Sequence, residues 1–269
     1  SGNIDTNSRL CMASSVAGHK RAFGADFVPV SYTDLEQADL VVLVGSNLAW
    51  CHPVLFQRLL AARDSRPGMR IVVIDPRRTP TAELADLHLP IRSGGDVALF
   101  GNLLVWLAEQ GHEDAAFVAQ HTNGLEDALR TAEAIQQAET EALTGLSRAQ
   151  IAAFREMFAA HDRTVTVFSQ GVNQAANGTD RVNAIINCHL LTGRIGRPGM
   201  GPFSITGQPN AMGGREVGGL ANQLAAHMEI ENPADWARVQ EFWQATAMAT
   251  RSGLKAVELF DAIEAGQGR

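Results

Sequence analysis

The sequence predicts an α/β protein with a Rossmann-like, open parallel sheet and helices on both faces. Three apolar, β-branched runs predict the sheet; they begin at Leu40, Met69 and Arg163. Runs of this kind are typical of strands that are buried on both faces of a parallel sheet. A helix-like segment separates the first two runs, and such strand–helix–strand units form parallel sheets with right-handed crossovers.

The first half of the chain predicts alternating strands and helices. After the strand at 40–47, "HPVLFQRLLAARD" has the spacing of a helix, with Pro53 in its first turn. The run from Met69 is the next strand, and a short strand follows from Leu87. The helix after that strand begins near Asp96, whose carboxylate is a candidate cap.

The second half continues this alternation and then changes character. Residues 126–160 predict helices with polar faces, and a strand from Arg163 leads to the helix "GTDRVNAIINCHLLTG". Thr179 or Asp180 is expected to cap that helix and Gly193 to end it. Residues 193–219 contain nine Gly and three Pro, which predicts a long functional loop. The last residues, 252–269, predict a further helix.

Composition limits the possible classes of protein. The chain has 269 residues, 45% hydrophobic and 19% charged, which is typical of globular domains. Its net charge of −7 argues against a nucleic-acid surface, and no apolar run reaches the roughly 18 residues of a membrane span. Its three cysteines lie far apart without a CxxC pair, which favours a reducing compartment and offers no iron–sulfur or zinc motif.

Polar residues follow three of the predicted strands directly. They are "GSN" at 45–47, "DPRR" at 75–78 and "GVNQ" at 171–174. Ligands of open α/β sheets bind beyond the carboxyl ends of the strands, so these endings indicate a nucleotide-like ligand. The same residues have simpler interpretations: Asn47 as a helix cap, or the Arg77–Arg78 pair as solvated charge. The fingerprint GxGxxG is absent, so an ordinary NAD site is not supported.

Two further residues have both a structural and a functional interpretation. Cys11 precedes a helix-like segment; it is either a small buried side chain or a thiolate suited to a soft metal. Cys51 and Cys188 lie in apolar surroundings and are assigned to the core. Arg215, inside the Gly-rich block, either pairs with Glu216 or binds a small anion.

Several long stretches together resemble the molybdopterin oxidoreductases of the dimethyl sulfoxide reductase superfamily. They include "NIDTNSRLCMASSVAGHKRAFG", "VVIDPRRTPTAELADLHLPIRSGGDVALF" and "GRIGRPGMGPFSITGQPNAMGGREVGG". Within that superfamily they are most similar to bacterial assimilatory nitrate reductases, and "LCMASSVAG" is also shared with the periplasmic ones. The resemblance runs along nearly the whole chain and is weakest over residues 126–160.

The resemblance implies a cofactor and a set of site residues. The cofactor is molybdenum held by the dithiolenes of two pterin–guanine dinucleotides, with Cys11 as the metal ligand. Met12, Gln208 and Arg215 match residues of the substrate funnel, where nitrate would be reduced to nitrite. The residues matching the binding of one dinucleotide are Gly45, Ser46, Asn47, His52, Asp75, Arg77, Asp96, Gly171 and Asn173.

The resemblance also implies a domain organisation. We expect an α/β dinucleotide-binding domain over residues 1–205 and part of a neighbouring α/β domain over 206–269. The family has an iron–sulfur [4Fe–4S] domain before this region and a further domain after it, so the chain is expected to be a central fragment that is inactive alone. The assimilatory resemblance implies cytoplasm, an electron donor of unknown identity, and neither nucleic acid nor membrane as a partner.

Two other functions remain open at this point. One is a formate dehydrogenase or another molybdopterin oxidoreductase, although formate enzymes usually place a His shortly after the metal ligand, where this chain has "LCMASSVAG". The other is a nucleotide-binding α/β module without redox chemistry, because one α/β layout serves many functions.

Overall fold

A computed structural model of the chain contains two compact units. One unit is Ser14–Gly207, and the other combines Ser1–Ala13 with Gln208–Arg269. The structure describes residues 10–134, 137–206, 211–220 and 223–243. The helix expected over 252–269 lies outside the described residues. Each unit is described by itself below.

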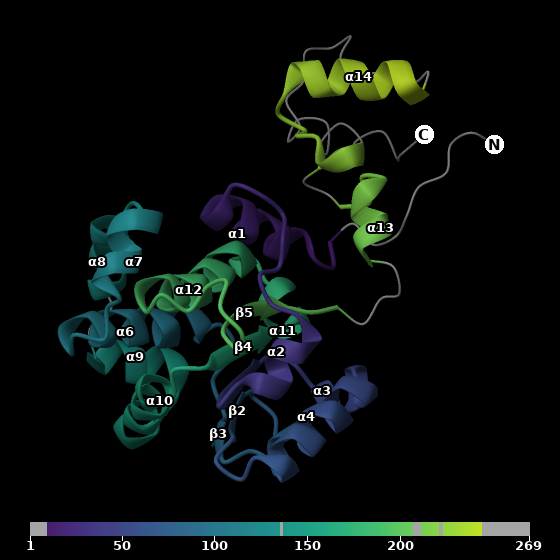
Figure 1. Cartoon of the computed structure of the whole chain (residues 1–269). Coiled ribbons are helices and arrows are strands. Elements are labelled where there is room, and N and C mark those ends of the chain that lie inside the picture. The colour runs from purple at the N-terminus through teal and green to yellow at the C-terminus, as the bar shows by residue number, and fades with distance from the viewer. Residues whose placement is uncertain (1–9, 135–136, 207–210, 221–222, 244–269) are drawn as a thin grey trace. The chain divides into compact units, whose positions relative to one another are not determined.

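The larger unit is built on a five-stranded, fully parallel sheet (Figure 1). Its strand order is β3-β2-β1-β4-β5, which is typical of a Rossmann-like fold. The central strands β1 and β4 are buried along their whole length, as is typical of a parallel sheet covered on both faces, and β1 consists of Leu and Val alone. The strands are β1 (Leu40–Val44), β2 (Arg70–Ile74), β3 (Leu87–Leu89), β4 (Thr164–Phe168) and β5 (Gly201–Ser204).

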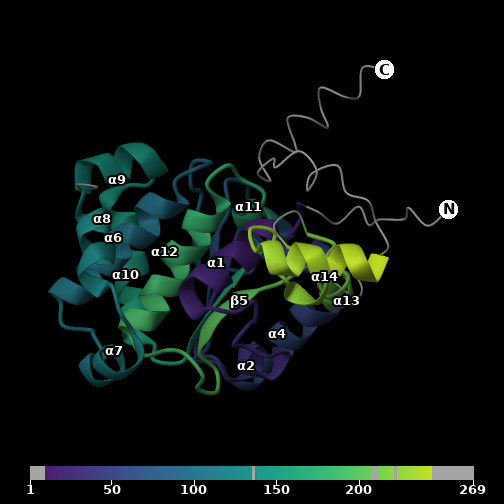
Figure 2. The same cartoon turned by 90° about the horizontal axis from the view of Figure 1, so that it is seen from above.

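Helices cover both faces of this sheet, so the predicted fold class is confirmed (Figures 1 and 2). One face carries α6 (Asp96–Glu109), α10 (Arg148–Ala160) and α12 (Gly178–Leu191), with α7 (Ala115–His121), α8 (Leu125–Glu133) and α9 (Gln137–Thr144) beside them. The other face carries α2 (Tyr32–Gln37), α3 (Leu48–Cys51), α4 (Pro53–Ser65) and α5 (Pro80–Glu83). The remaining helices are α1 (Ala13–Phe23), which lies against α12, and α11 (Gln170–Asn173), which follows β4.

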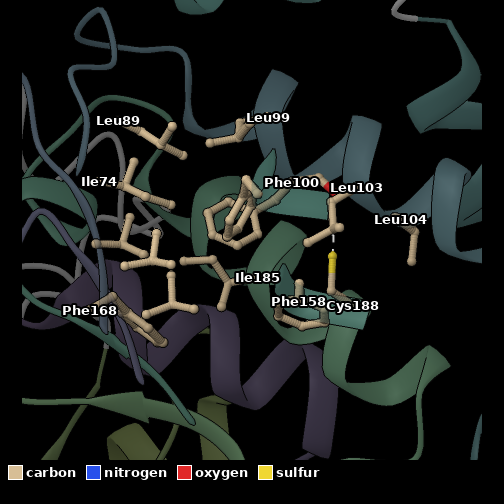
Figure 3. Packing of buried hydrophobic residues seen from close by; sticks show 14 of the residues in the cluster. Ile74, Leu89, Leu99, Phe100, Leu103, Leu104, Phe158, Phe168, Ile185 and Cys188 are labelled. Atoms are coloured by element: carbon tan, nitrogen blue, oxygen red, sulfur yellow. Dashed lines mark hydrogen bonds between the residues drawn. The ribbon is translucent and has the colours of Figure 1, made fainter. Parts of the chain in front are cut away.

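The side-chain alternation of β1 divides the core into two clusters. Leu40, Val42 and Val44 belong to the cluster that contains α6, α10 and α12, whereas Val41 and Leu43 belong to the cluster under α4. Successive side chains of a strand point to opposite faces, so each face receives its own apolar set. Figure 3 shows the first cluster, in which the Cys188 thiol donates to the Phe100 carbonyl oxygen at 3.3 Å.

Several local details differ from the expectations. Strand β5 lies inside the Gly-rich block, where only a loop was expected, because Gly and Pro hide a short edge strand from pattern analysis. Asp96 is not a cap: Gly95 occupies the cap position of α6, and Asp96 is its first helical residue. Asn177, not Thr179 or Asp180, precedes α12, while Gly193 follows it with φ +63° as expected for a helix stop.

His189 is a buried neutral base in this core. Its ring is fully buried, and Nε2 lies 2.8 Å from the Thr166 hydroxyl. Burial, together with the positive charge of Arg194, lowers the pKa of His189 from 6.5 to about 3. The Arg194 guanidinium lies 4.8 Å from the centre of the Phe158 ring and donates to the Phe158 carbonyl oxygen at 3.0 Å.

Acid is therefore expected to destabilise the protein through His189. Between pH 6.5 and about 3, the unfolded chain protonates this residue and the folded chain does not, so stability is lost as pH falls through that window. The loss is about 1.4 kcal/mol per pH unit from this group. Urea unfolding at pH 7 and pH 5 should show a smaller pH effect in His189→Gln. His121→Gln, which changes an exposed histidine, should leave the pH effect as it is.

Among its described residues, the smaller unit contains three short helical segments. They are α13 (Ala211–Glu216), the 3₁₀ turn η1 (Ala225–His227) and α14 (Pro233–Trp243). The lead-in to α14 is held by side chains: the Glu229 amide donates to Asp235 at 3.0 Å and the Ala234 amide donates to Asn232 at 3.0 Å. Over the described part of the whole chain, none of the helices is both long and apolar enough to cross a bilayer.

Candidate functional site

The main cavity of the larger unit lies where β1, β2 and β4 end. Its volume is about 420 Å³, within the roughly 300–1,000 Å³ typical of small-molecule sites. The strand order reverses between β1 and β4, and ligands of open α/β sheets bind at such a switch point. The lining residues are Gly45, Asn47, Cys51, Ile74, Asp75, Pro76, Arg77, Ile91, Ser93, Asp96, Ser169, Gln170, Gly171 and Arg181.

Two glycines bring the ends of β1 and β4 into backbone contact at this cavity. The Gly171 amide donates to the Gly45 carbonyl oxygen at 3.1 Å. A Cβ on Gly171 would lie 2.5 Å from the Gly45 Cα, and a Cβ on Gly45 would lie 2.7 Å from the Gly171 Cα. Gly45 also has φ +54°, which L-residues rarely adopt. Only glycine fits at both positions.

Three predicted residues after β1 and β2 face the same cavity. The Asn47 side-chain oxygen accepts from the Thr81 hydroxyl at 2.8 Å, which leaves its NH₂ group to donate. The Asp75 carboxylate is buried and accepts from the Arg77 amide at 2.8 Å. The Arg77 guanidinium is 76% exposed, with its Nε 4.0 Å from Asp75 Oδ1, so it is available to an anionic ligand.

Another wall of the cavity contains a buried ion pair, and sequence analysis predicted only one of its two residues. Asp96 was predicted, whereas Arg181 was not. Arg181 Nη1 lies 3.1 Å from Asp96 Oδ2, and both side chains are about nine-tenths buried. The two residues come from different helices, α6 and α12, so no local sequence pattern links them.

The other predicted cofactor-binding residues lie elsewhere in the unit. Ser46 is 2% exposed and does not line the cavity. Asn173 is 1% exposed and accepts from the Ser15 hydroxyl at 2.7 Å, which ties α11 to α1. His52 joins α3 to α4 and lines a separate hollow of about 280 Å³ with Tyr32 and Arg58. The cavity thus brings together six of the nine predicted residues: Gly45, Asn47, Asp75, Arg77, Asp96 and Gly171.

Cys51 does not belong to the core, contrary to expectation. It ends the four-residue helix α3, and its side chain is exposed and lines the cavity. The apolar neighbours that favoured burial, Trp50 and Val54, are themselves 71% and 70% exposed. Cys188, in contrast, is fully buried as predicted.

The described residues predicted to act on substrate belong to the smaller unit. Cys11 is half-buried two residues before α1 begins, and Met12 is 2% exposed. Arg215 lies in α13 and is 5% exposed, with its backbone oxygen accepting from Gln223 Nε2 at 3.1 Å. The neighbouring Glu216 pairs with His227, whose Nε2 lies 3.4 Å from Glu216 Oε1. Gln208 lies outside the described residues.

A metal site in the described part of the chain would depend on few protein ligands. Over residues 10–134, 137–206, 211–220 and 223–243, no group of three or more His, Cys, Asp or Glu side chains is placed to hold a metal ion.

Comparison with known proteins gives one family and a consistent set of relatives. The family model for molybdopterin oxidoreductase matches residues 1–268. A nitrate reductase of Klebsiella oxytoca is 54% identical over 98% of this chain and 30% of its own length. One from Shewanella frigidimarina is 51% identical over 98% of this chain and 28% of its own. An assimilatory nitrate reductase of Haloferax mediterranei is 37% identical over 90% of this chain and 33% of its own.

A solved structure agrees with the fold. Acetylene hydratase from Pelobacter acetylenicus superposes with a TM-score of 0.63 and 25% identity, covering 72% of this chain and 26% of that one. The chain spans about a third or less of the length of each of these four proteins.

Proposed function

The chain belongs to the molybdopterin oxidoreductase family, and from this premise we propose that it is the central part of a nitrate reductase. The proposed reaction takes up two electrons and two protons, removes one oxygen atom from nitrate, and releases nitrite and water. The observation that carries the proposal is the match along almost the whole chain, at 54% and 51% identity, to two nitrate reductases.

The cofactor proposed is molybdenum with two pterin–guanine dinucleotides, one of which would occupy the cavity. The residues there fit a nucleotide. Asp75 and Asp96 offer carboxylate acceptors, Arg77 offers an exposed guanidinium to phosphate, and Asn47 has donors free to turn toward the ligand. When bound, the molybdenum centre would supply the two-electron redox chemistry, while the protein supplies binding and orientation.

The remaining predicted residues have roles on the substrate side. Cys11 would give a thiolate to the metal, a ligand type that soft metals prefer. Arg215 would bind nitrate through charge-assisted hydrogen bonds, which suit the planar guanidinium. Gln208 and Met12 would line the path of the anion. The proposal leaves Ser46, His52 and Asn173 as cofactor-binding residues that act from outside the main cavity.

The setting of the reaction is also proposed. A [4Fe–4S] cluster outside this chain would deliver electrons from a donor protein, and the location proposed is the cytoplasm. One relative is an assimilatory nitrate reductase, whereas one from Desulfovibrio desulfuricans is a periplasmic nitrate reductase. Because the chain spans about 30% of the nitrate reductases it matches most strongly, we expect the 269-residue chain alone to be inactive. Nitrite production by the purified chain with a reduced viologen dye would contradict this.

The first test is the composition and activity of the full-length protein. Metal analysis should find molybdenum, and released nucleotide should be guanine-based, with two dinucleotides for each metal. The purified protein should reduce nitrate and should not oxidise formate. Formate oxidation alone would shift the assignment to a formate dehydrogenase, and absence of molybdenum would favour a nucleotide-binding module without redox chemistry.

A further inference from the structure

The buried ion pair between Asp96 and Arg181 forms one wall of the cavity. Asp96 begins α6 and is 6% exposed, and Arg181 lies in the first turns of α12 and is 8% exposed. Both residues line the cavity, so the pair lies beside whatever the cavity binds. A buried pair of this kind is weak support for stability alone, because desolvation offsets much of its attraction. A role in binding accounts for it better.

Arg181 is held in one orientation by three acceptors. Its Nε donates to Asn177 Oδ1 at 2.8 Å, and its Nη1 donates to the Gly171 carbonyl oxygen at 3.1 Å. Nη1 also lies 3.1 Å from Asp96 Oδ2. Since the guanidinium is planar, these contacts fix the whole group, and the guanidinium in turn fixes the Asp96 carboxylate.

The charge of Arg181 also favours the ionised form of Asp96, which it contacts. Burial raises the pKa of Asp96 and is the largest influence on it, while the positive charge of Arg181 acts in the opposite direction. Asp75 and Arg77 are the other charged residues that line the cavity. A carboxylate only accepts hydrogen bonds, whereas a protonated carboxyl also donates one. Removing Arg181 would therefore change which ligand atoms Asp96 can recognise.

We propose that Arg181 is a positioning residue that holds Asp96 as an oriented acceptor, so that the cavity selects a base presenting two adjacent N–H donors. Guanine presents such a pair, its ring N–H and its amino group, whereas adenine presents the amino group beside ring acceptors. This inference rests on the nucleotide-binding part of the proposed function. In this inference, Arg181 on α12 controls the selection through Asp96 and does not contact the ligand directly.

The experiment measures binding of GDP and ADP to the full-length protein, purified from cells that make no pterin cofactor. The wild-type protein should prefer GDP. Arg181→Gln should weaken GDP binding at least about tenfold, the size expected for a hydrogen bond to a charged group, and change ADP binding little. When the solution is acidified, Arg181→Gln should lose GDP binding at a higher pH than the wild type does. A purely structural role would not cause this shift.

Two controls separate this role from loss of folding. Arg21→Gln removes a comparable arginine on α1, which pairs with Asp180 at 2.8 Å but is 59% exposed, and should leave the GDP preference unchanged. Arg181→Lys keeps the positive charge without the planar fork. Compared with Arg181→Gln, it should recover part of the preference for GDP and most of the wild-type pH dependence of GDP binding.

A double-variant cycle tests whether Arg181 acts through Asp96. In an Asp96→Asn background, Arg181→Gln should have almost no further effect on the GDP-to-ADP ratio. Equal losses of GDP and ADP binding that persist in that background would mean that Arg181 contacts the phosphates directly, and would overturn the inference. If the wild-type protein binds GDP no better than ADP, the proposed guanine-nucleotide site itself fails, and this inference fails with it.

Discussion

Replacing Cys11 with serine is expected to abolish nitrate reduction in the full-length protein while leaving it folded. A thiolate is a soft, polarisable ligand, whereas a serine hydroxyl is a hard ligand that stays protonated at neutral pH. Loss of residues that only support metal ligands already costs about 10–100-fold, so removal of a ligand should leave less than about 1% of wild-type turnover.

The measurement is nitrite formed per molecule of protein, together with molybdenum and guanine-nucleotide content. The matched control is Cys188→Ser, because the buried Cys188 thiol donates to the Phe100 carbonyl oxygen at 3.3 Å and a hydroxyl can make the same bond. That variant should keep most of its turnover. Near-normal turnover in Cys11→Ser, with molybdenum retained, would remove Cys11 from the metal site.

The sheet and the position of the cavity could be predicted because both depend on local patterns. Runs such as "LVVLV" in β1 are read directly as buried strands, and parallel strands bring their carboxyl ends to one edge. Gly45, Asp75 and Gly171 follow three such strands, so their convergence follows from topology alone. The same reasoning could not find β5, whose four residues include a glycine and a proline and whose strand character depends on pairing with β4.

The direction of a side chain, and its partners that are distant in sequence, could not be predicted from local patterns. Cys51 and Cys188 both have apolar neighbours in sequence, yet one is exposed at the cavity and the other fully buried. Arg181 meets Asp96 only because α12 lies against α6 in the folded unit. Asp96 was predicted through family resemblance, whereas its partner Arg181 was given no role there and carried no local signal.

Replacing Gly171 with alanine is expected to disrupt the cavity and to destabilise the larger unit. The new Cβ would lie 2.5 Å from the Gly45 Cα and 2.9 Å from its carbonyl oxygen, closer than such atoms approach in proteins. Neither neighbour is a flexible side chain, so the ends of β1 and β4 must separate. Overpacking of this kind typically costs about 1–3 kcal/mol. Separation would also break the bond from the Gly171 amide to the Gly45 carbonyl oxygen.

The effect should appear in both stability and nucleotide content, because one backbone contact joins the sheet to the cavity. Urea unfolding measures the first, and guanine nucleotide released from the purified full-length protein measures the second. Gly68→Ala is the matched control, since a Cβ there meets nothing within 4 Å. It should match the wild type in both measurements. A Gly171→Ala protein with full nucleotide content would show that the ligand does not depend on the junction of β1 and β4, and would place the nucleotide outside this cavity.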